Sequence, residues 1–186
     1  MDRTILETLN VVLRFGYQIF TNPEEIHVED IFLDETYDKL LNYVKNHECI
    51  CMLSTLNEFE YCKANHAIEL NKNEFEKKLR ERYSELKEHC RIGLHTHLAR
   101  GKSIERLDYG EQRKKIRNGI DFLESLGIET SHFAPGWWSW NQNTIKACKD
   151  LGIKHFHLVR GQRGNFDEGE GIELVTVNHY CHDFNL

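Results

Sequence analysis

The chain has 186 residues, with 24 Lys and Arg against 30 Asp and Glu; the net charge of −6 argues against a general nucleic-acid binder, because phosphate binding calls for a basic face. A hydrophobic share of 40% and a charged share of 29% exclude a disordered or fibrous chain. We therefore expect one domain over residues 1–186, in which residues 1–22 form a peripheral N-terminal segment.

The sequence predicts neither a membrane span nor a signal peptide. No apolar run reaches about 18 residues, the length that a membrane helix requires. Near the start, Asn10, Arg14 and Gln18 interrupt the apolar stretch that a signal peptide would need. We expect a cytoplasmic protein whose six cysteines are reduced thiols packed in a core.

Segments of helical period alternate with strand-like runs, a pattern typical of a parallel sheet built by crossover helices. Strands are expected at residues 26–30, 49–54, 91–95, 132–134, 153–159 and 172–177. Helices are expected at residues 35–45, 73–89, 112–125 and 141–151. The predicted fold class is therefore α/β.

Polar residues stand where two of these strands end. In parallel folds, ligands bind where the carboxyl ends of the strands open into loops. The first expected strand ends in Glu29-Asp30, and the third in His95-Thr96-His97. Residues two apart on a strand face the same way, so His95 and His97 can present nitrogen atoms to one point. With a carboxylate from another strand they would form a site that suits zinc or another divalent first-row ion.

Other polar and aromatic residues allow two interpretations. Glu29-Asp30 could be a solvated turn with a helix cap. His155 and His157 repeat the two-residue spacing, but His155 falls near the start of its strand, so we expect a structural role. Trp137, Trp138 and Trp140 follow Pro135-Gly136, and either sugar stacking or ordinary packing would suit them.

The run Arg91-Ile92-Gly93-Leu94-His95-Thr96-His97 resembles the metal-binding motif of the polysaccharide deacetylase superfamily (NodB homology, carbohydrate esterase family 4). Glu29-Asp30 resembles the Asp-Asp motif of that family, and Phe133-Ala134-Pro135-Gly136 its Arg-x-Pro motif. The closing strand with His179 resembles the final apolar-His motif. The similarity covers about residues 26–184, and it implies a distorted (β/α) barrel with fewer than eight strands.

The same resemblance implies a hydrolase that removes N-acyl groups from amino sugars with the help of a divalent metal, usually zinc. Three positions depart from the family pattern. Ala99 stands where the family commonly has its second histidine, four residues after the first. Phe133 replaces the arginine that orients the catalytic carboxylate, and Glu29 stands where Asp is usual.

The resemblance assigns roles to particular residues. Asp30, His95 and His97 would hold Zn²⁺, while Glu29 would take a proton from water. His179, or failing that His182, would protonate the leaving amine, with Asp183 to orient it. Adjacent residues on a strand point to opposite faces, so a shift of one residue in the strand would exchange the roles of Glu29 and Asp30. Substrate contacts would come from Pro135, Trp137, Trp138 and Trp140.

The expected partner is a small-molecule or oligosaccharide substrate, and the oligomeric state is left open. Two alternatives use the same scaffold. One is a metal-dependent amidase that acts on a cyclic or other acyl amide outside the sugars. The other is a catalytically silent carbohydrate-binding domain, which Phe133 and Glu29 would favour.

Overall fold

The computed structural model describes residues 25–55, 59–65, 69–97, 103–159, 171–177 and 180–182. Seven strands form one sheet in the order β6-β5-β4-β3-β2-β1-β7, and every neighbouring pair is parallel. The strands are β1 (Glu25–Val28), β2 (Ile50–Leu53), β3 (Arg91–Thr96), β4 (His132–Pro135), β5 (His155–Val159), β6 (Glu173–Val177) and β7 (Tyr180–His182). The first six strands follow one another in space as in sequence, and β7 adds to the free side of β1.

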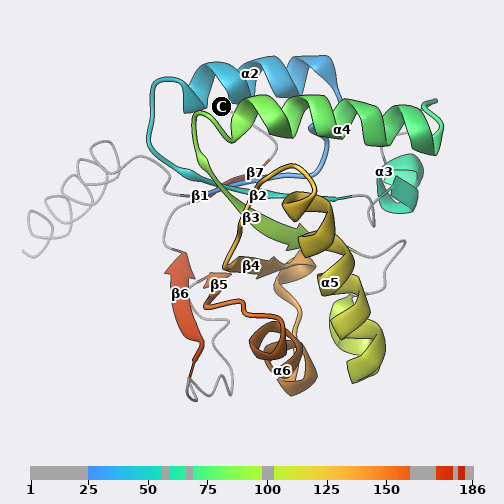
Figure 1. Ribbon diagram of the computed structural model, residues 1–186, viewed down its shortest axis with the longest axis vertical. Coiled ribbons are helices and arrows are strands. Elements are labelled where there is room, and N and C mark those ends of the chain that lie inside the picture. The colour runs from blue at the N-terminus through green and yellow to red at the C-terminus, as the bar shows by residue number, and fades with distance from the viewer. Residues whose placement is uncertain are drawn as a thin grey trace, which may run out of the picture.

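The helices cover the outer face of the sheet. They are α2 (Asp34–Val44), α3 (Phe59–Asn65), α4 (Lys72–Leu86), α5 (Tyr109–Glu124) and α6 (Gln142–Asp150), with short 3₁₀ turns η2 (Ile104–Arg106) and η3 (Gly136–Trp138). In Figure 1, α2 and α4 lie side by side over one half of the sheet, and α5 and α6 lie over the other half. Asn71 and Asn141 begin α4 and α6 with reciprocal capping boxes, which satisfy backbone N–H groups at each helix start.

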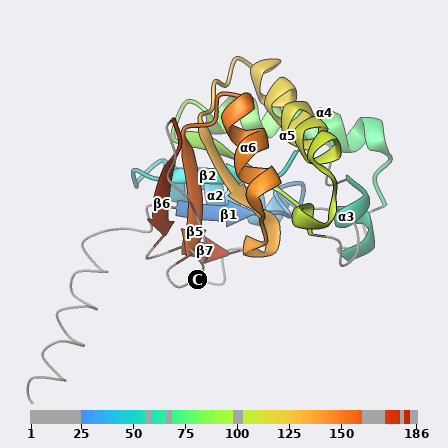
Figure 2. The same ribbon diagram turned by 90° about the horizontal axis from the view of Figure 1, so that it is seen from below.

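The sheet is curled into part of a barrel. In Figure 2, β1 and β2 run across the view while β5 and β6 stand steeply to them. A side-chain contact shows the same curl, because Glu25 of β1 lies 2.6 Å from His157 of β5. Four strand spacings of about 4.8 Å would separate β1 and β5 in a flat sheet. The contact therefore crosses the interior of the barrel, which we call the lumen.

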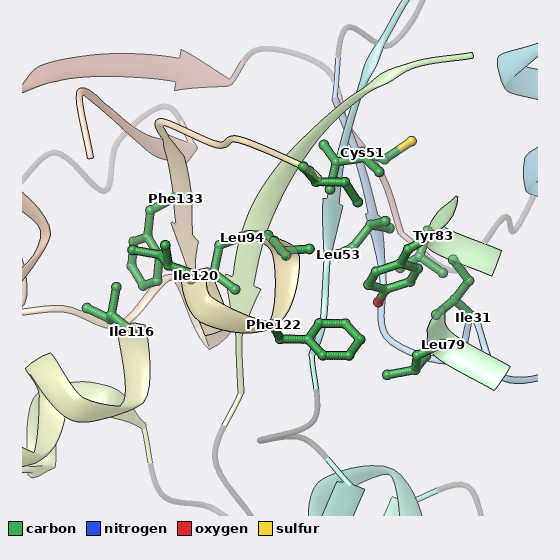
Figure 3. Packing of buried hydrophobic residues seen from close by; sticks show 14 of the residues in the cluster. Ile31, Cys51, Leu53, Leu79, Tyr83, Leu94, Ile116, Ile120, Phe122 and Phe133 are labelled. Carbon is green, nitrogen blue, oxygen red and sulfur yellow. The ribbon is translucent and has the colours of Figure 1, made fainter. Parts of the chain in front are cut away.

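Each strand alternates between the helix layer and the lumen. Ile26 and Val28 of β1 belong to the apolar core, whereas Glu25 and His27 belong to a buried polar network in the lumen. Figure 3 shows part of the helix-side core, where Leu94 and Phe133 pack near Ile120 of α5 and Tyr83 of α4 lies near Leu53. The main apolar core lies between sheet and helices, and the inside of the barrel holds polar side chains together with a small apolar cluster of Ile50, Met52 and Ala134.

Gly93 leaves room for Met52 in this lumen. A Cβ atom at position 93 would overlap the Met52 Sδ and lie 2.8 Å from its Cε and 3.1 Å from His132 Cβ. We expect Gly93→Ala to lower the free energy of unfolding by about 2 kcal/mol, because overpacking displaces neighbours in a filled interior. Urea unfolding followed by circular dichroism measures this, and Met52→Ala in the same chain should relieve part of the loss.

Gly110→Ala is the matched control, since position 110 lies in the first turn of α5 and an added Cβ meets only the Asp108 carboxylate, at 3.3 Å. An equal loss of stability in Gly93→Ala and Gly110→Ala would contradict the packing argument.

The expected α/β fold is confirmed, with fewer than eight strands in an incomplete barrel. Every strand and helix expected between residues 26 and 177 has a counterpart, although their ends differ by a few residues. Four of the described elements were not expected, namely α3, η2, η3 and β7. The N-terminal segment 1–22 lies outside the described residues. Among the helices that the structure describes, none combines the length and the apolarity needed to cross a bilayer.

Candidate metal centre

Glu29, His95 and His97 converge at the carboxyl ends of β1 and β3. Glu29 directly follows β1, His95 lies within β3, and His97 follows its last residue. The Nε2 atoms of the two histidines are 2.8 Å apart, and Glu29 Oε1 lies 2.6 Å from His97 Nε2 and 3.7 Å from His95 Nε2. All three side chains are buried. Among the described residues, this set is the one group of His, Cys, Asp or Glu whose ligand atoms are close enough to share a metal ion.

His95 is oriented for this task by a backbone group. Its Nδ1 lies 3.0 Å from the carbonyl oxygen of Ala134, to which it donates a hydrogen bond. Burial is the main cause of a lowered pKa for His95, although the nearby Glu29 acts in the opposite direction. A neutral imidazole that donates from Nδ1 carries its lone pair on Nε2, the form that binds a metal ion.

Tyr61 of α3 supports the carboxylate and one of the imidazoles. Its hydroxyl donates to Glu29 Oε2 at 2.6 Å, and its ring stacks on His97 with centroids 4.7 Å apart. The neighbouring Cys62 Sγ lies 3.4 Å from the Glu29 carbonyl oxygen. Tyr61 therefore holds Oε2 while Oε1 faces the histidines. Tyr61 was not expected from the sequence, because no periodic pattern marks the short helix that carries it.

Two tryptophans flank the centre in an unusual backbone conformation. Trp137 and Trp138 have φ angles of 57° and 54°, which non-glycine residues rarely adopt, and such strain gathers at functional sites. Trp137 is 57% exposed, and its ring meets His97 edge-on at 5.0 Å. Trp138 packs against His27 at 4.8 Å. Gly136 makes this turn fit, because a Cβ there would collide with the Thr96 carbonyl and approach the His97 ring to 2.9 Å.

A second polar network fills the lumen below the centre. The Glu25 carboxylate lies 2.5 Å from His27 Nε2 and 2.6 Å from His157 Nδ1. His157 Nε2 continues the chain to His132 Nδ1 at 2.9 Å. His27 in turn meets His95 edge-on, with centroids 4.7 Å apart. The network therefore links β1, β4 and β5 and backs the ring of a candidate ligand.

The electrostatics of this network follow from its hydrogen bonds. Burial by itself raises the pKa of Glu25, but hydrogen bonds from His157 and His27 outweigh it and lower the pKa to about 2. His132 has its pKa lowered to about 4, mainly by burial and then by the charges of His157, His155 and Arg91. Both groups therefore hold fewer protons in the folded state than in the unfolded chain.

Acid should destabilise the fold in two steps. His132 stabilises the folded state above its unfolded pKa of about 6.5 and loses that contribution as the pH falls toward 4. Glu25 loses its contribution as the pH falls from about 4.5 toward 2. We expect the free energy of unfolding to drop by about 1 kcal/mol over the first step, after allowance for solvent screening of the half-buried His132.

Urea unfolding at a series of pH values measures both steps. His132→Gln should flatten the first step, and His89→Gln, at an exposed histidine of the same chain, should leave it unchanged. A first step of equal size in His132→Gln and in the unaltered protein would rule out the assignment to His132.

The remaining residues of the predicted site are distributed as follows. Asp30 lies next to the centre in sequence, but its Oδ2 accepts a hydrogen bond from Thr36 of α2 at 3.1 Å. Pro135 is buried at the end of β4. Trp140 packs against Phe156 in the helix-side core, so it is not brought to the centre. Phe133, at the position of the family's arginine, is fully buried in the same core.

The residues that were predicted to supply and orient the general acid lie near the C-terminal end of the sequence. His179 and Asp183 lie outside the described residues. His182 ends β7, whose backbone pairs with β1 so that position 182 stands opposite His27. The strand β7 therefore runs beside β1, the strand that leads to Glu29. His155 and His157, expected to be structural, contact Glu173 and Glu25 respectively, both through Nδ1.

The donor set fits a divalent metal ion. Two imidazole nitrogens and one carboxylate oxygen within 4.8 Å of one another match the ligand types and spacing of zinc and related ions. The spacing of the two histidines indicated His95 and His97, but the sequence-based expectation gave the carboxylate ligand as Asp30 and not Glu29. The sequence also contains a pattern that could have predicted the lumen network. Glu25, His27 and Glu29 are spaced two residues apart, so their side chains share one face of a strand.

No protein-family model and no curated protein matches the sequence. Solved structures match the fold. A pseudoenzyme of carbohydrate esterase family 4 from Bacillus anthracis aligns with a TM-score of 0.52 and 13% identity over 73% of this chain and 43% of its own. A 4-alpha-glucanotransferase from Thermococcus litoralis aligns with a TM-score of 0.55 and 13% identity over 83% of this chain and 27% of its own.

A family 4 carbohydrate esterase from Streptomyces lividans, in complex with acetate, aligns with a TM-score of 0.48 and 10% identity over 70% of this chain and 58% of its own. The chain therefore spans about half the length of the two esterase-family structures. At 13% identity, the similarity to the Bacillus anthracis and Thermococcus litoralis structures is a similarity of fold. The protein has the distorted, incomplete (β/α) barrel fold found among the polysaccharide deacetylases of carbohydrate esterase family 4.

Proposed function

We propose that this protein is a metal-dependent hydrolase that removes an N-acyl group, most simply N-acetyl, from an amino sugar or glycan precursor. The observation that carries the proposal is the buried set of Glu29, His95 and His97 at the carboxyl ends of parallel strands. The exposed ring of Trp137 stands beside His97, where it can stack on a sugar.

Glu29, His95 and His97 would hold the ion, most simply Zn²⁺. When bound, such an ion polarises an amide carbonyl and lowers the pKa of water. Because Glu29 rather than Asp30 faces the histidines, we exchange the two roles expected from the sequence. Asp30 then accepts the proton of the attacking water. Tyr61 keeps Glu29 in place through its hydrogen bond to Oε2.

The leaving amine needs a proton, and the C-terminal histidines supply it in this proposal. An imidazole suits that task near neutral pH. We assign it to His179, with His182 as the alternative and Asp183 as the orienting carboxylate. The parallel pairing of β7 with β1 supports this assignment, because it brings the C-terminal segment to the strand that leads to Glu29.

The test is release of acetate from a panel of N-acetylated sugars, oligosaccharides and nucleotide sugars by the zinc-loaded protein. We expect turnover on at least one member and its loss in His97→Ala. A second arm with cyclic and other acyl amides tests the amidase alternative. No release from any compound, with one zinc per chain bound, would overturn the proposal.

A silent carbohydrate-binding domain is the second candidate. Phe133 favours it, because the position that carries the family's arginine is fully buried in the apolar core. Sugar binding measured by calorimetry, together with no release of acetate, would establish this alternative. The release of acetate therefore distinguishes the hydrolase from the silent carbohydrate-binding domain.

A further inference from the structure

Three cysteines gather at the end of the sheet opposite the candidate metal centre. Cys49 directly precedes β2, Cys51 lies within it, and Cys90 directly precedes β3. Cys49 and Cys51 are buried, whereas Cys90 is partly exposed. The Sγ atoms of Cys90 and Cys51 are 3.4 Å apart although 39 positions separate them in sequence. From the sequence, these thiols are expected to be ordinary packing residues.

Cys90 stands in the wall of a pocket. The pocket has a volume of about 440 Å³, and Arg91, Ser131 and His132 also line it. A peroxide molecule is far smaller than this volume, and Cys90 is the one of the three cysteines that is partly exposed and lines the pocket. Cys51 has no such access, because its side chain is fully buried behind Cys90.

Hydrogen bonds connect the three thiols in a row, with Cys51 in the middle. Cys90 donates to Cys51, and the hydrogen bond between Cys51 and Cys49 lowers the pKa of Cys49, with a smaller effect from the Arg91 charge. The pKa of Cys51 is raised, first by its hydrogen bond with Cys49 and then by that with Cys90. Cys51 therefore stays a thiol in contact with both neighbours, and Cys90 is the member that meets solvent.

We propose that Cys90 and Cys51 form an oxidation site, at which a peroxide oxidises Cys90 and Cys51 captures the product as an intramolecular disulfide. The Cys90 sulfur attacks one peroxide oxygen, the O–O bond breaks, and Cys90 becomes a sulfenic acid as water leaves. The Cys51 sulfur then attacks the Cys90 sulfur and displaces the hydroxyl group, which leaves as water with the Cys51 proton. Two thiols lose two electrons, and the peroxide is reduced to two molecules of water.

The disulfide would join β2 to the connection between α4 and β3. Its formation requires the two sulfurs to approach from 3.4 Å to a bond length of about 2.0 Å. The bond lies at the amino ends of the strands, away from Glu29, His95 and His97. It would therefore link the amino ends of β2 and β3 and leave the candidate metal centre unaltered. The oxidation proposal does not depend on the proposed hydrolase activity.

The test treats the reduced, full-length protein with hydrogen peroxide, blocks the remaining thiols by alkylation and maps the digest by mass spectrometry without a reductant. We expect a cross-link between the peptides of Cys51 and Cys90. Cys148 is fully buried in α6 and serves as an internal control, because it should escape oxidation and be recovered in the alkylated form. Cys49→Ser should keep the cross-link.

Two further variants make the test decisive. Cys90→Ser removes one half of the cross-link and should leave Cys51 an unoxidised thiol that is recovered alkylated, because Cys51 is fully buried and its partly exposed partner is gone. Cys51→Ser, or Cys51→Ala where the serine disturbs the core, should drive Cys90 to sulfinic and sulfonic acids, because no partner captures the sulfenic acid. A dominant cross-link to any other cysteine, or equal Cys90 overoxidation with and without Cys51, would overturn the proposal.

Discussion

Replacing His95 or His97 by Ala should lower the affinity for zinc roughly 100-fold or more, since loss of even a supporting residue around a metal costs about 10- to 100-fold. Each change removes one of the two nitrogens that lie 2.8 Å apart in the centre. Dialysis against a metal buffer, followed by elemental analysis, gives the occupancy per chain. The fold should persist, because the apolar core lies on the other side of the sheet.

His89→Ala is the matched control, because His89 is exposed and precedes β3, whereas His95 and His97 lie at the other end of that strand. Its zinc occupancy should equal that of the unaltered protein. If His95→Ala retains full occupancy instead, the ion binds elsewhere, and His157 with its contact to Glu25 becomes the next position to test.

The isosteric pair Glu29→Gln and Asp30→Asn should separate metal binding from turnover. Glu29→Gln should lose the ion, because it removes the charge that faces both histidines. Asp30→Asn should keep the ion and lose about 10²- to 10⁴-fold in the rate of acyl release, the usual contribution of a general base. The two measurements are zinc occupancy and acetate release on the same preparations.

The opposite pattern of zinc loss in these two variants would contradict the assignment of Glu29 as the ligand and Asp30 as the base. Zinc lost in Asp30→Asn and kept in Glu29→Gln would restore the roles expected from the sequence. Unchanged turnover in Asp30→Asn would make Asp30 a turn residue, held by its hydrogen bond with Thr36.

Period and spacing were enough to predict the six strands and four of the five α-helices described between residues 26 and 177, and to pair His95 with His97. They could not decide between Glu29 and Asp30, because that choice depends on a single position in the strand. Here β1 ends at Val28, two residues before the expected end. The alternation within β1 decides the matter: Ile26 and Val28 belong to the apolar core, so Glu29 shares the lumen side with His27.

The contributions of Tyr61 and Glu25 depend on tertiary structure. Tyr61 reaches Glu29 from a seven-residue helix, too short to show a repeat of its own. Glu25 precedes the expected first strand, and its partner His157 is 132 positions away. Only the curl of the sheet brings them together, and no local pattern encodes that curl.

The Glu25–His157 contact also bears on how the protein folds. It joins the first described strand to the fifth across 132 residues, so it is formed only after most of the sheet has assembled. His132 extends this contact to β4, and because burial lowers its pKa, its imidazole must lose a proton before it is enclosed at acid pH. We therefore expect closure of the barrel to be a late step that slows as the pH falls, whereas the helix-side core is built from apolar contacts that carry no such dependence.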